Sequence, residues 1–315
     1  MECSRRLFIE GIGAFTAVSV VGCKSPKKGE LPLMRFGLVT DCHYADIPYA
    51  KREHPIGDAA YRETLSKLRE CVAVMDSERP SFLIELGDFK DQGPDKASTI
   101  EYLDRVEAVF SKFSGPRYHV LGNHDLDLID KQEFLSRVTN YGQKEALPHY
   151  SFEVAGIKFI VLDACYNSKL EDYVPGNWDW TDANVPPQEL AWLEDELASA
   201  TGQVIVFGHQ CLDPNADPRH IVRNAADVRA ILEKSGKVNA VFTGHQHAGL
   251  ISCVNGITYY SLRAMVLNSG ENGYAVADVY PSGGIVVTGF RKAASAKWQS
   301  RGLRRGSEES LRRRP

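Results

Sequence analysis

Five apolar segments of the 315-residue chain end in side chains of the types that bind metal ions. The segments are FGLVTDCH, LIELGD, HVLGNHD, VIVFGH and AVFTGHQH. Their length and composition predict buried β-strands. Strands disfavour Gly, Asn and Asp, so these endings require another explanation. Because sites in open α/β sheets form at the carboxyl ends of strands, the fold should bring these endings together.

Segments with helical spacing of apolar residues alternate with these strands, at 61–79, 100–113, 186–200 and 225–234. Two more strands are expected around the turn at Ala155-Gly156, and residues 250–290 alternate as short antiparallel strands. Strands alternating with helices predict sheets covered by helices. We therefore expect one domain at residues 33–290.

The spacing of the polar residues at these strand ends indicates which side chains point to the same side of a strand. Asp41 and His43 are two residues apart, as are His245 and His247, so each pair points to one side of its strand. Glycine precedes four of the polar residues and permits a sharp turn and a close backbone approach, before Asp88, Asn123, His209 and His245. A single GD or GH is typical of a turn, whereas clustered histidines are typical of ligands.

The motifs DxH, GDxxD, GNHD, GH and GHxH follow one another in this order. With them, the chain resembles the calcineurin-like metallophosphoesterases from Arg35 to Tyr280. The resemblance implies an α/β (α+β) fold, a four-layer αββα sandwich of two mixed β-sheets flanked by helices, which is the metallo-dependent phosphatase fold. It also implies an enzyme, a hydrolase of phosphate esters that depends on two divalent metal ions.

The resemblance assigns ligands to both ions. The first would be held by Asp41, His43 and His247, the second by Asn123, His209 and His245, and Asp88 would bridge them. Oxygen and nitrogen ligands fit Mn, Fe, Zn or Co. Asp91 stands where purple acid phosphatases carry tyrosine, so an iron–tyrosine site is not expected.

The resemblance also implies a mechanism. A metal-bridging hydroxide would attack phosphorus, and His124 would protonate the leaving group as a catalytic acid. Asp125 would orient His124 through a hydrogen bond. The alternative for Asp125 is a helix N-cap.

The stretch TDCHYAD resembles the TDxxYAD of the manganese-dependent ADP-ribose and CDP-alcohol diphosphatases, which usually carry glutamine at the position of His43. Small phosphorylated or nucleoside-diphosphate-type substrates are therefore expected for a phosphodiesterase or phosphatase. Tyr44, Arg263 and Trp178 are candidate substrate residues. Trp178 or Trp180 would stack on a base or instead fix its own loop, and Arg263 would meet a phosphate or form a surface ion pair.

The sequence leaves two other functions open. One is a phosphomonoesterase acting on envelope glycan or lipid phosphates. The other is an enzyme-inactive, metal-binding envelope scaffold, which would be expected to lack Asn123, His124 or a bridging ligand. All of these residues are present.

The N-terminal residues 1–23 resemble a bacterial export signal. Arg5 and Arg6 precede a short apolar run, as in twin-arginine signals, and the run ends in a lipobox-like sequence at Cys23. We expect export to the periplasm, or a lipoprotein anchored to the membrane through Cys23. A plain secretory signal or a frayed helix are the alternatives. Residues 24–32 are expected to be a linker.

Charge limits the partners that the chain would bind, and cysteine content limits its disulfides. A net charge of -4 and a pI near 6.2 give no reason to expect nucleic acid as a regulatory partner. The basic segment 291–315 is expected to be a disordered, solvated tail, with a contact to anionic lipid as the alternative. The cysteines after residue 23 are odd in number and show no CxxC spacing, so we expect no disulfide framework.

Overall fold

Two β-sheets face each other in the computed structural model, which describes residues 17–21, 23–48 and 57–299. The first sheet has the strand order β1-β13-β12-β11-β2-β3-β4, and the second has the order β5-β6-β7-β8-β10-β9. Both sheets are mixed, because β2, β3 and β4 run parallel while β2 and β11 are antiparallel, and β6, β7 and β8 run parallel while β9 and β10 are antiparallel.

The strands of the first sheet are β1 (Ala17–Val21), β2 (Met34–Val39), β3 (Leu83–Glu85), β4 (Arg117–His119), β11 (Gly273–Val279), β12 (Ile285–Arg291) and β13 (Ser295–Gln299). Those of the second are β5 (Tyr150–Val154), β6 (Ile157–Val161), β7 (Val204–Phe207), β8 (Val238–Thr243), β9 (Leu250–Val254) and β10 (Ile257–Ser261). The helices are α1 (Thr64–Glu78), α2 (Lys96–Phe110), α3 (Lys131–Leu135), α4 (Pro187–Ser199) and α5 (Ala225–Ser235), with short 3-10 turns at Tyr61–Glu63 and His124–Leu126.

Aromatic side chains fill the space between the sheets. Phe36 of β2 stacks on Phe82, with ring centroids 5.3 Å apart, and meets Phe242 of β8 edge-on at 5.3 Å. Phe159 and Phe207 of the second sheet also contact Phe36 at 5.8 and 5.6 Å. All five rings are fully buried, so this contact fixes one sheet against the other.

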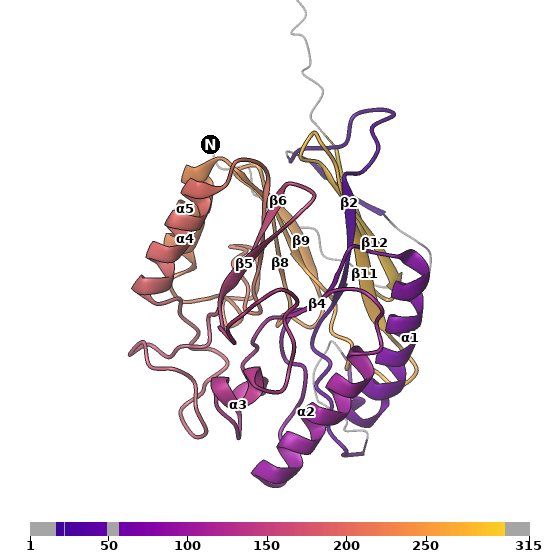
Figure 1. The fold of residues 1–315 in the computed structure, drawn as a ribbon, viewed down its shortest axis with the longest axis vertical. Helices are drawn as coiled ribbons and strands as arrows, with labels where there is room; N and C mark the ends of the chain where they lie inside the picture. Colours follow the sequence, from indigo (N-terminus) through magenta and orange to yellow (C-terminus); the bar gives the residue numbers. More distant parts are fainter. Residues whose placement is uncertain (1–16, 22, 49–56, 300–315) are drawn as a thin grey trace, which may run out of the picture.

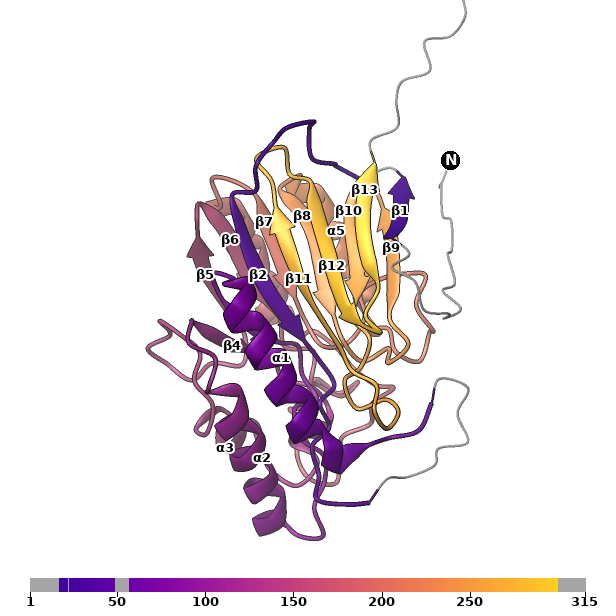
Figure 2. The same ribbon diagram turned by 90° about the vertical axis from the view of Figure 1, so that its right-hand side faces the viewer.

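The helices cover the outer faces. The buried side chains of α1 and α2 form one core with β2 and β3, and those of α4 and α5 form another with β6, β7 and β8. In Figures 1 and 2, α1 and α2 lie beside the first sheet, and Figure 1 places α4 and α5 beside the second. This arrangement confirms the expected four-layer αββα sandwich. Within the described ranges, no helix combines the length and apolar character needed to cross a bilayer.

Local sequence sets the helix ends. The Asp95 side chain accepts a hydrogen bond from the Ser98 N–H at 2.7 Å and caps α2. Pro187 begins α4, where its missing N–H costs nothing, and Gly236 ends α5 in the left-handed conformation.

Both ends of the described chain carry strands that the sequence did not predict. β12 continues to Arg291 and β13 occupies residues 295–299, inside the segment expected to be disordered from residue 291. β13 pairs in parallel with β1, which lies inside the expected export signal. The order of residues 291–299 corrects the start of the tail, whereas the Arg5-Arg6 pair and residues 300–315 lie outside the described residues.

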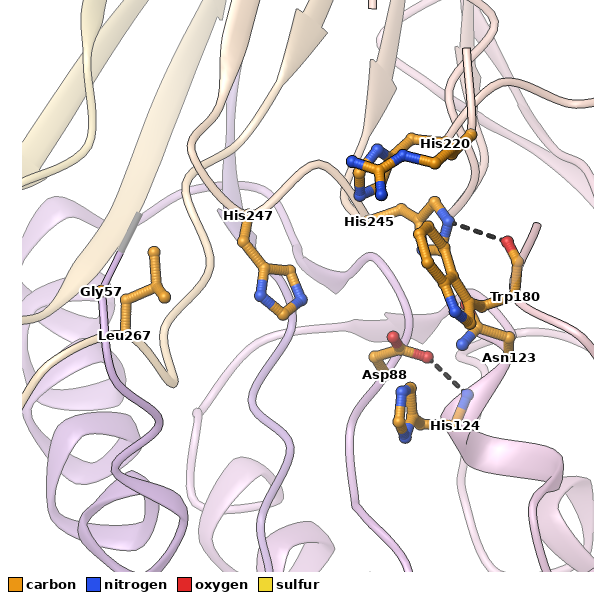
Figure 3. A pocket seen from close by; sticks show the side chains of 10 residues that line it. Gly57, Asp88, Asn123, His124, Trp180, His220, His245, His247 and Leu267 are labelled. Atoms are coloured by element: carbon orange, nitrogen blue, oxygen red, sulfur yellow. Dashed lines mark hydrogen bonds between the residues drawn. The ribbon is translucent and has the colours of Figure 1, made fainter. Parts of the chain in front are cut away.

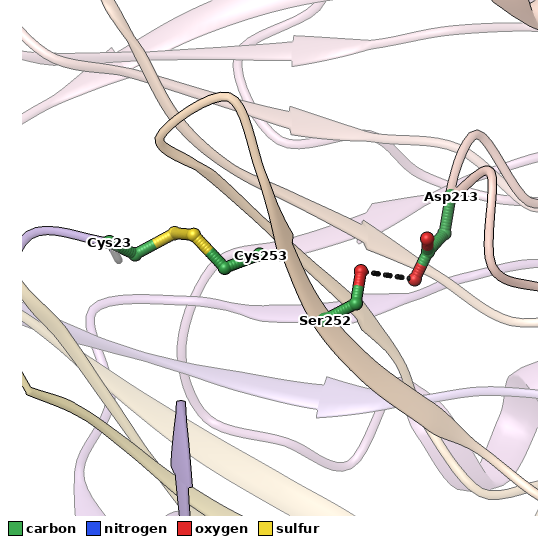
Figure 4. The surroundings of a disulfide bond; sticks show 4 residues. All are labelled: Cys23, Asp213, Ser252 and Cys253. Carbon is green, nitrogen blue, oxygen red and sulfur yellow. Dashed lines mark hydrogen bonds between the residues drawn. A yellow bond between two sulfur atoms is a disulfide. The ribbon is translucent and has the colours of Figure 1, made fainter. Parts of the chain in front are cut away.

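A disulfide joins Cys23 to Cys253 of β9, with 6.1 Å between the Cα atoms (Figure 4). The sequence predicted no disulfide framework and assigned Cys23 to lipid attachment, so it missed this bond. Sequence spacing says nothing of two cysteines that are 230 residues apart. Cys42, Cys71, Cys165 and Cys211 are free and buried.

Candidate dimetal site

The five polar endings meet where the two sheets converge. Asp41 and His43 follow β2, Asp88 follows β3, and Asn123 follows β4. From the second sheet, His209 follows β7, and His245 and His247 follow β8. Figure 3 shows His245 and Asn123 on one side of Asp88 and His247 on the other. The strand order therefore brings every predicted ligand to one place.

The first predicted ligand group is closely packed. The Nε2 atoms of His43 and His247 lie 3.2 Å apart, and His247 Nε2 lies 3.2 Å from Asp41 Oδ1. Two imidazole nitrogens facing each other at this distance need a proton or a cation between them. With the buried carboxylate beside them, they fit a divalent metal ion.

The second group shares Asp88 with the first. Asp88 Oδ2 lies 3.1 Å from His209 Nε2 and 3.4 Å from His43 Nε2. His209 Nδ1 lies 2.8 Å from the Leu86 carbonyl, which fixes the proton on Nδ1 and leaves the Nε2 lone pair directed at the site. The buried Asn123 amide has no hydrogen-bond partner in the described chain. The Asn123 side-chain oxygen and His209 Nε2, both without a hydrogen-bond partner there, fit a second ion.

His245 completes this group and reaches a loop with its other nitrogen. Its Nε2 atom lies 3.2 Å from the Trp180 carbonyl oxygen, and its ring lies 5.0 Å from that of His209. A backbone acceptor on the far side of a ligand histidine sets the orientation of the ring. The loop before α4 therefore supports the metal site.

Backbone strain concentrates on the ligand positions. Asp41, His43, Asp88 and His245 have φ angles of 48°, 45°, 56° and 62°, in the left-handed region that side chains other than glycine rarely adopt. Each such residue costs on the order of 1–3 kcal/mol and is typical of functional sites.

Two glycines permit the close approach of the chain segments. A Cβ atom on Gly122 would lie 2.2 Å from the Asp88 backbone nitrogen and 2.3 Å from Asp88 Oδ1. A Cβ atom on Gly244 would lie 2.0 Å from Thr40 Oγ1 and 2.6 Å from Asp41 Oδ2. The glycines before Asn123 and His245 are thus required by packing, as the motif spacing suggested, whereas Gly208 has open space around it.

The acidic ligands remain ionised. Burial alone would raise the pKa of Asp41, but His247 and His43 outweigh it and hold the pKa well below its usual range. Burial opposes ionisation of Asp88 too, and His209, His124 and His43 lower its pKa. The site therefore keeps two buried negative charges that a pair of cations would neutralise.

His124 lies beside the metal-ligand groups, as predicted, but its carboxylate neighbour is Asp91. His124 Nδ1 is 3.4 Å from Asp91 Oδ1, and Asp91 Oδ2 is 3.2 Å from His43 Nδ1. Burial would raise the pKa of Asp91, but His124 and His43 hold it well below its usual range. The GDxxD motif contained this residue, but its sequence gave no sign that it would meet the GNHD histidine.

Asp125 has a different role from the one expected. Its carboxylate accepts the backbone N–H groups of Asp88 at 2.9 Å, Phe89 at 2.9 Å and Gly122 at 2.8 Å. It thereby fixes the turn that carries Asp88, and the described contacts of Asp125 include neither the His124 ring nor an N-cap bond. The structure therefore corrects both predictions for Asp125, that it orients His124 and that it caps a helix.

A cavity of about 280 Å³ opens over the site. Asp88, Asn123, His124, His245 and His247 line its floor, and Trp180, Arg219, His220, Gly57 and Leu267 line the rest. The Trp178 ring lies 5.1 Å from His124, so this candidate is close to the reacting centre.

Tyr44 and Arg263 lie elsewhere. Tyr44 is buried in the core against Tyr102, and its hydroxyl accepts from Arg105 at 3.3 Å. Arg263 pairs with Glu271 at 2.9 Å beside a different cavity. The structure thus favours the ion-pair alternative for Arg263 and does not bring Tyr44 to the cavity.

A lysine secures the loop that borders the first ligands. Lys67 Nζ donates to the carbonyls of Met265, Leu267 and Asn268 at 3.0, 3.2 and 2.8 Å. The same loop donates the N–H groups of Met265 and Val266 to the carbonyls of Thr40 and Asp41. Burial lowers the pKa of Lys67 to about 8. Sequence periodicity placed Lys67 on a helix but gave no sign of this role.

Residues 34–249 match the family described as calcineurin-like phosphoesterase. The chain belongs to this family. The chain also places three groups of metal-ligand side chains around Asp88 and His124. Together with the family match, these groups identify a metal-dependent phosphoesterase and confirm the expected enzyme class and dimetal cofactor.

Relatives of the chain carry related names. A rice protein named manganese-dependent ADP-ribose/CDP-alcohol diphosphatase is 26% identical over 84% of this chain and 94% of its own length. A Fibrobacter succinogenes protein named probable cyclic nucleotide phosphodiesterase is 24% identical over 73% of this chain and 79% of its own. The crystal structure of a dimetal phosphatase from Danio rerio has a TM-score of 0.76 at 22% identity, covering 84% of this chain and 98% of that one.

The glycine packing yields a direct test. Gly122→Ala should displace the Asp88 turn and lower the free energy of unfolding by about 1–3 kcal/mol. It should also reduce the bound metal, measured by elemental analysis. Gly208→Ala is the matched control, because a Cβ there meets nothing within 4 Å. Full metal content in Gly122→Ala, or equal losses in both variants, would contradict this account of the site.

Proposed function

We propose that this protein hydrolyses small phosphodiesters and diphosphates, with nucleoside-diphosphate-type compounds as its substrates. The observation that carries the proposal is the convergence of two ligand groups on Asp88, with His124 beside them on the cavity floor. The names of the rice and Fibrobacter relatives support this substrate class.

Each part of the site has a task in this reaction. When bound, two divalent ions would supply a water of lowered pKa and offset the negative charge of the phosphate. The chain's own contribution begins with Asp88, whose two oxygens face opposite partners: Oδ1 accepts the His124 N–H at 2.7 Å and Oδ2 faces His209. This holds the His124 backbone, and with it the ring, in a fixed place relative to the ligands.

His124 delivers a proton to the leaving oxygen. Its side chain is 25% exposed, so it reaches the cavity, while Asp91 lies against its Nδ1 atom. A carboxylate beside Nδ1 orients the ring, so Nε2 is the atom that donates to the leaving oxygen. Trp178 packs against the same ring and restricts its rotation.

The scaffold alternative is not favoured. A protein that had lost catalysis would have no need to retain Asn123, and His124 beside Asp91, around strained ligand turns, since that strain costs stability. The phosphomonoesterase alternative differs only in substrate and is addressed by the same assay.

The first prediction of this proposed function concerns substrate and metal together. Metal-loaded protein should hydrolyse ADP-ribose or CDP-choline and bis-p-nitrophenyl phosphate in preference to p-nitrophenyl phosphate. Chromatography of the nucleotide products and absorbance of released p-nitrophenol measure the rates. Chelation should abolish all activity, and Mn, Zn, Fe or Mg returned in parallel should identify the ion that restores it. Preference for the monoester would replace the proposal with the phosphomonoesterase function.

A second prediction concerns the acid. His124→Ala should lower kcat by about 10²–10⁴-fold, because the leaving oxygen loses its proton donor, while elemental analysis still finds both ions. His149→Ala is the control histidine, since His149 packs on Trp192 away from the cavity. Near-wild-type turnover in His124→Ala would remove this role.

We also propose that the protein is exported to the cell envelope. The support is the sequence of residues 1–23, with its arginine pair and its apolar run. Cys23 is then either lipidated or joined to Cys253, because a sulfur that carries lipid cannot form the disulfide bond. We favour export, with the disulfide in the non-lipidated protein and membrane anchoring where Cys23 is lipidated.

Mass spectrometry of protein from the native or a bacterial host distinguishes these forms. A Cys23 peptide linked to the Cys253 peptide indicates an unlipidated, oxidised envelope protein, and a diacylglyceryl adduct indicates the anchored one. Protein found only in the cytoplasm, with residues 1–22 retained and both thiols reduced, would refute export.

A further inference from the structure

We infer that Arg219 binds the second phosphate of a diphosphate substrate, the one that is not attacked, and so selects diphosphates over simple esters. This inference rests on the proposed function and adds a specificity-determining residue to it. Arg219 lies in the segment between β7 and α5 and lines the cavity together with the floor residues Asp88 and His124.

A continuous wall leads from the ligand His245 to Arg219. The Trp180 ring lies 5.9 Å from the ring of His245, and the Arg219 guanidinium carbon lies 5.8 Å from the centre of the Trp180 ring. His220 fills the corner, with its ring 5.1 Å from Trp180 and 5.0 Å from His245. Figure 3 shows Trp180 and His220 on the same side of the cavity as His245.

Arg219 is the one arginine or lysine among the described residues that line this cavity. A substrate with a second phosphate therefore meets the Arg219 guanidinium on this wall of the cavity. The guanidinium fork matches phosphate oxygens two at a time.

The present partner of Arg219 is easily exchanged. Its Nη2 and Nε atoms lie 2.9 and 3.2 Å from the carboxylate of Asp217, and the Arg219 side chain is 60% exposed. Exposed ion pairs of this kind contribute little to stability. A negatively charged phosphate therefore competes with Asp217 at low cost.

The backbone that carries Arg219 is tied to the metal motif. The Asp217 N–H donates to Gln246 Oε1 at 2.9 Å, and Gln246 stands between His245 and His247 in the chain. The Arg219 N–H in turn donates to Asp217 Oδ1 at 3.0 Å. The distance between the charge and the reacting centre is thus set by the ligand turn itself.

The reaction that fits this arrangement is cleavage of the bridging P–O bond. The water oxygen bonds to one phosphorus, and the electron pair of the broken bond goes to the oxygen of the other phosphate. One water proton stays on the attacked phosphate or is lost to solvent, and the other balances the leaving phosphate. Two phosphomonoesters result, and Arg219 stabilises the charge on the phosphate that it holds.

The test compares substrates with one and two phosphates on the metal-loaded, full-length protein. Arg219→Ala should lower kcat/KM for ADP-ribose about 10- to 100-fold and change that for bis-p-nitrophenyl phosphate less than about twofold, since a charged hydrogen-bond partner is lost for only one of them. Arg219→Lys should recover only part of the loss. Arg223→Ala, a 58% exposed arginine in the same segment, is the control.

Calorimetry with α,β-methylene ADP, which the enzyme cannot cleave at the bridge, gives a second readout. Arg219→Ala should weaken its binding about 10- to 100-fold relative to wild type and Arg223→Ala. Equal losses on both substrates, or unchanged ADP-ribose kinetics and unchanged binding, would overturn the role of Arg219. Wild-type protein that binds the analogue through Arg219 but cleaves nothing would instead refute the proposed hydrolysis.

Discussion

The position of Asp88 is the constraint on which the rest of the site depends. Its carboxylate must face histidines from both sheets, while its backbone continues from β3 of the first sheet. This is achieved at a φ of 56°, with the Asp88 N–H held by Asp125 and Oδ1 held by the His124 N–H. The aromatic contact centred on Phe36 sets the separation of the two sheets, and that separation determines how far His209 is from Asp88.

The same geometry explains how so many buried charges are tolerated. Asp41, Asp88 and Asp125 are fully or almost fully buried, and an isolated carboxylate in such a place is costly. Asp125 is compensated by three backbone N–H groups, so it needs no cation. Asp41 and Asp88 face imidazole Nε2 atoms, two of which also crowd one another, and a cation fits that arrangement. The polar groups therefore divide into those that build the turn and those that bind the ions.

The sequence predicted what local pattern and motif order determine: the strands that end in ligands, the four long helices, the two ligand groups and His124. It could not predict contacts made only in three dimensions. The meeting of Asp91 with His124, the clamp formed by Lys67 and the bond between Cys23 and Cys253 join residues far apart in the chain. β1 and β13 were missed because their pairing joins the two ends of the described chain, and the surrounding composition favoured a signal and a solvated tail. Tyr44 was predicted at the site because it follows His43, but its side chain packs into the core against Tyr102.

Catalysis and selectivity are carried by different parts of the fold. The ligands sit on strand ends, where the sheet ladder fixes them, whereas Trp178, Trp180 and Arg219 belong to the connections before α4 and α5. Such connections vary without disturbing the sheets, which is why one scaffold serves many phosphate esters. Here the two connections are not independent of the ions: the Trp180 carbonyl holds the ligand His245, and Gln246 holds the turn of Asp217. A change in either loop therefore alters the second ligand group as well as the cavity wall, so selectivity and metal binding must be measured together.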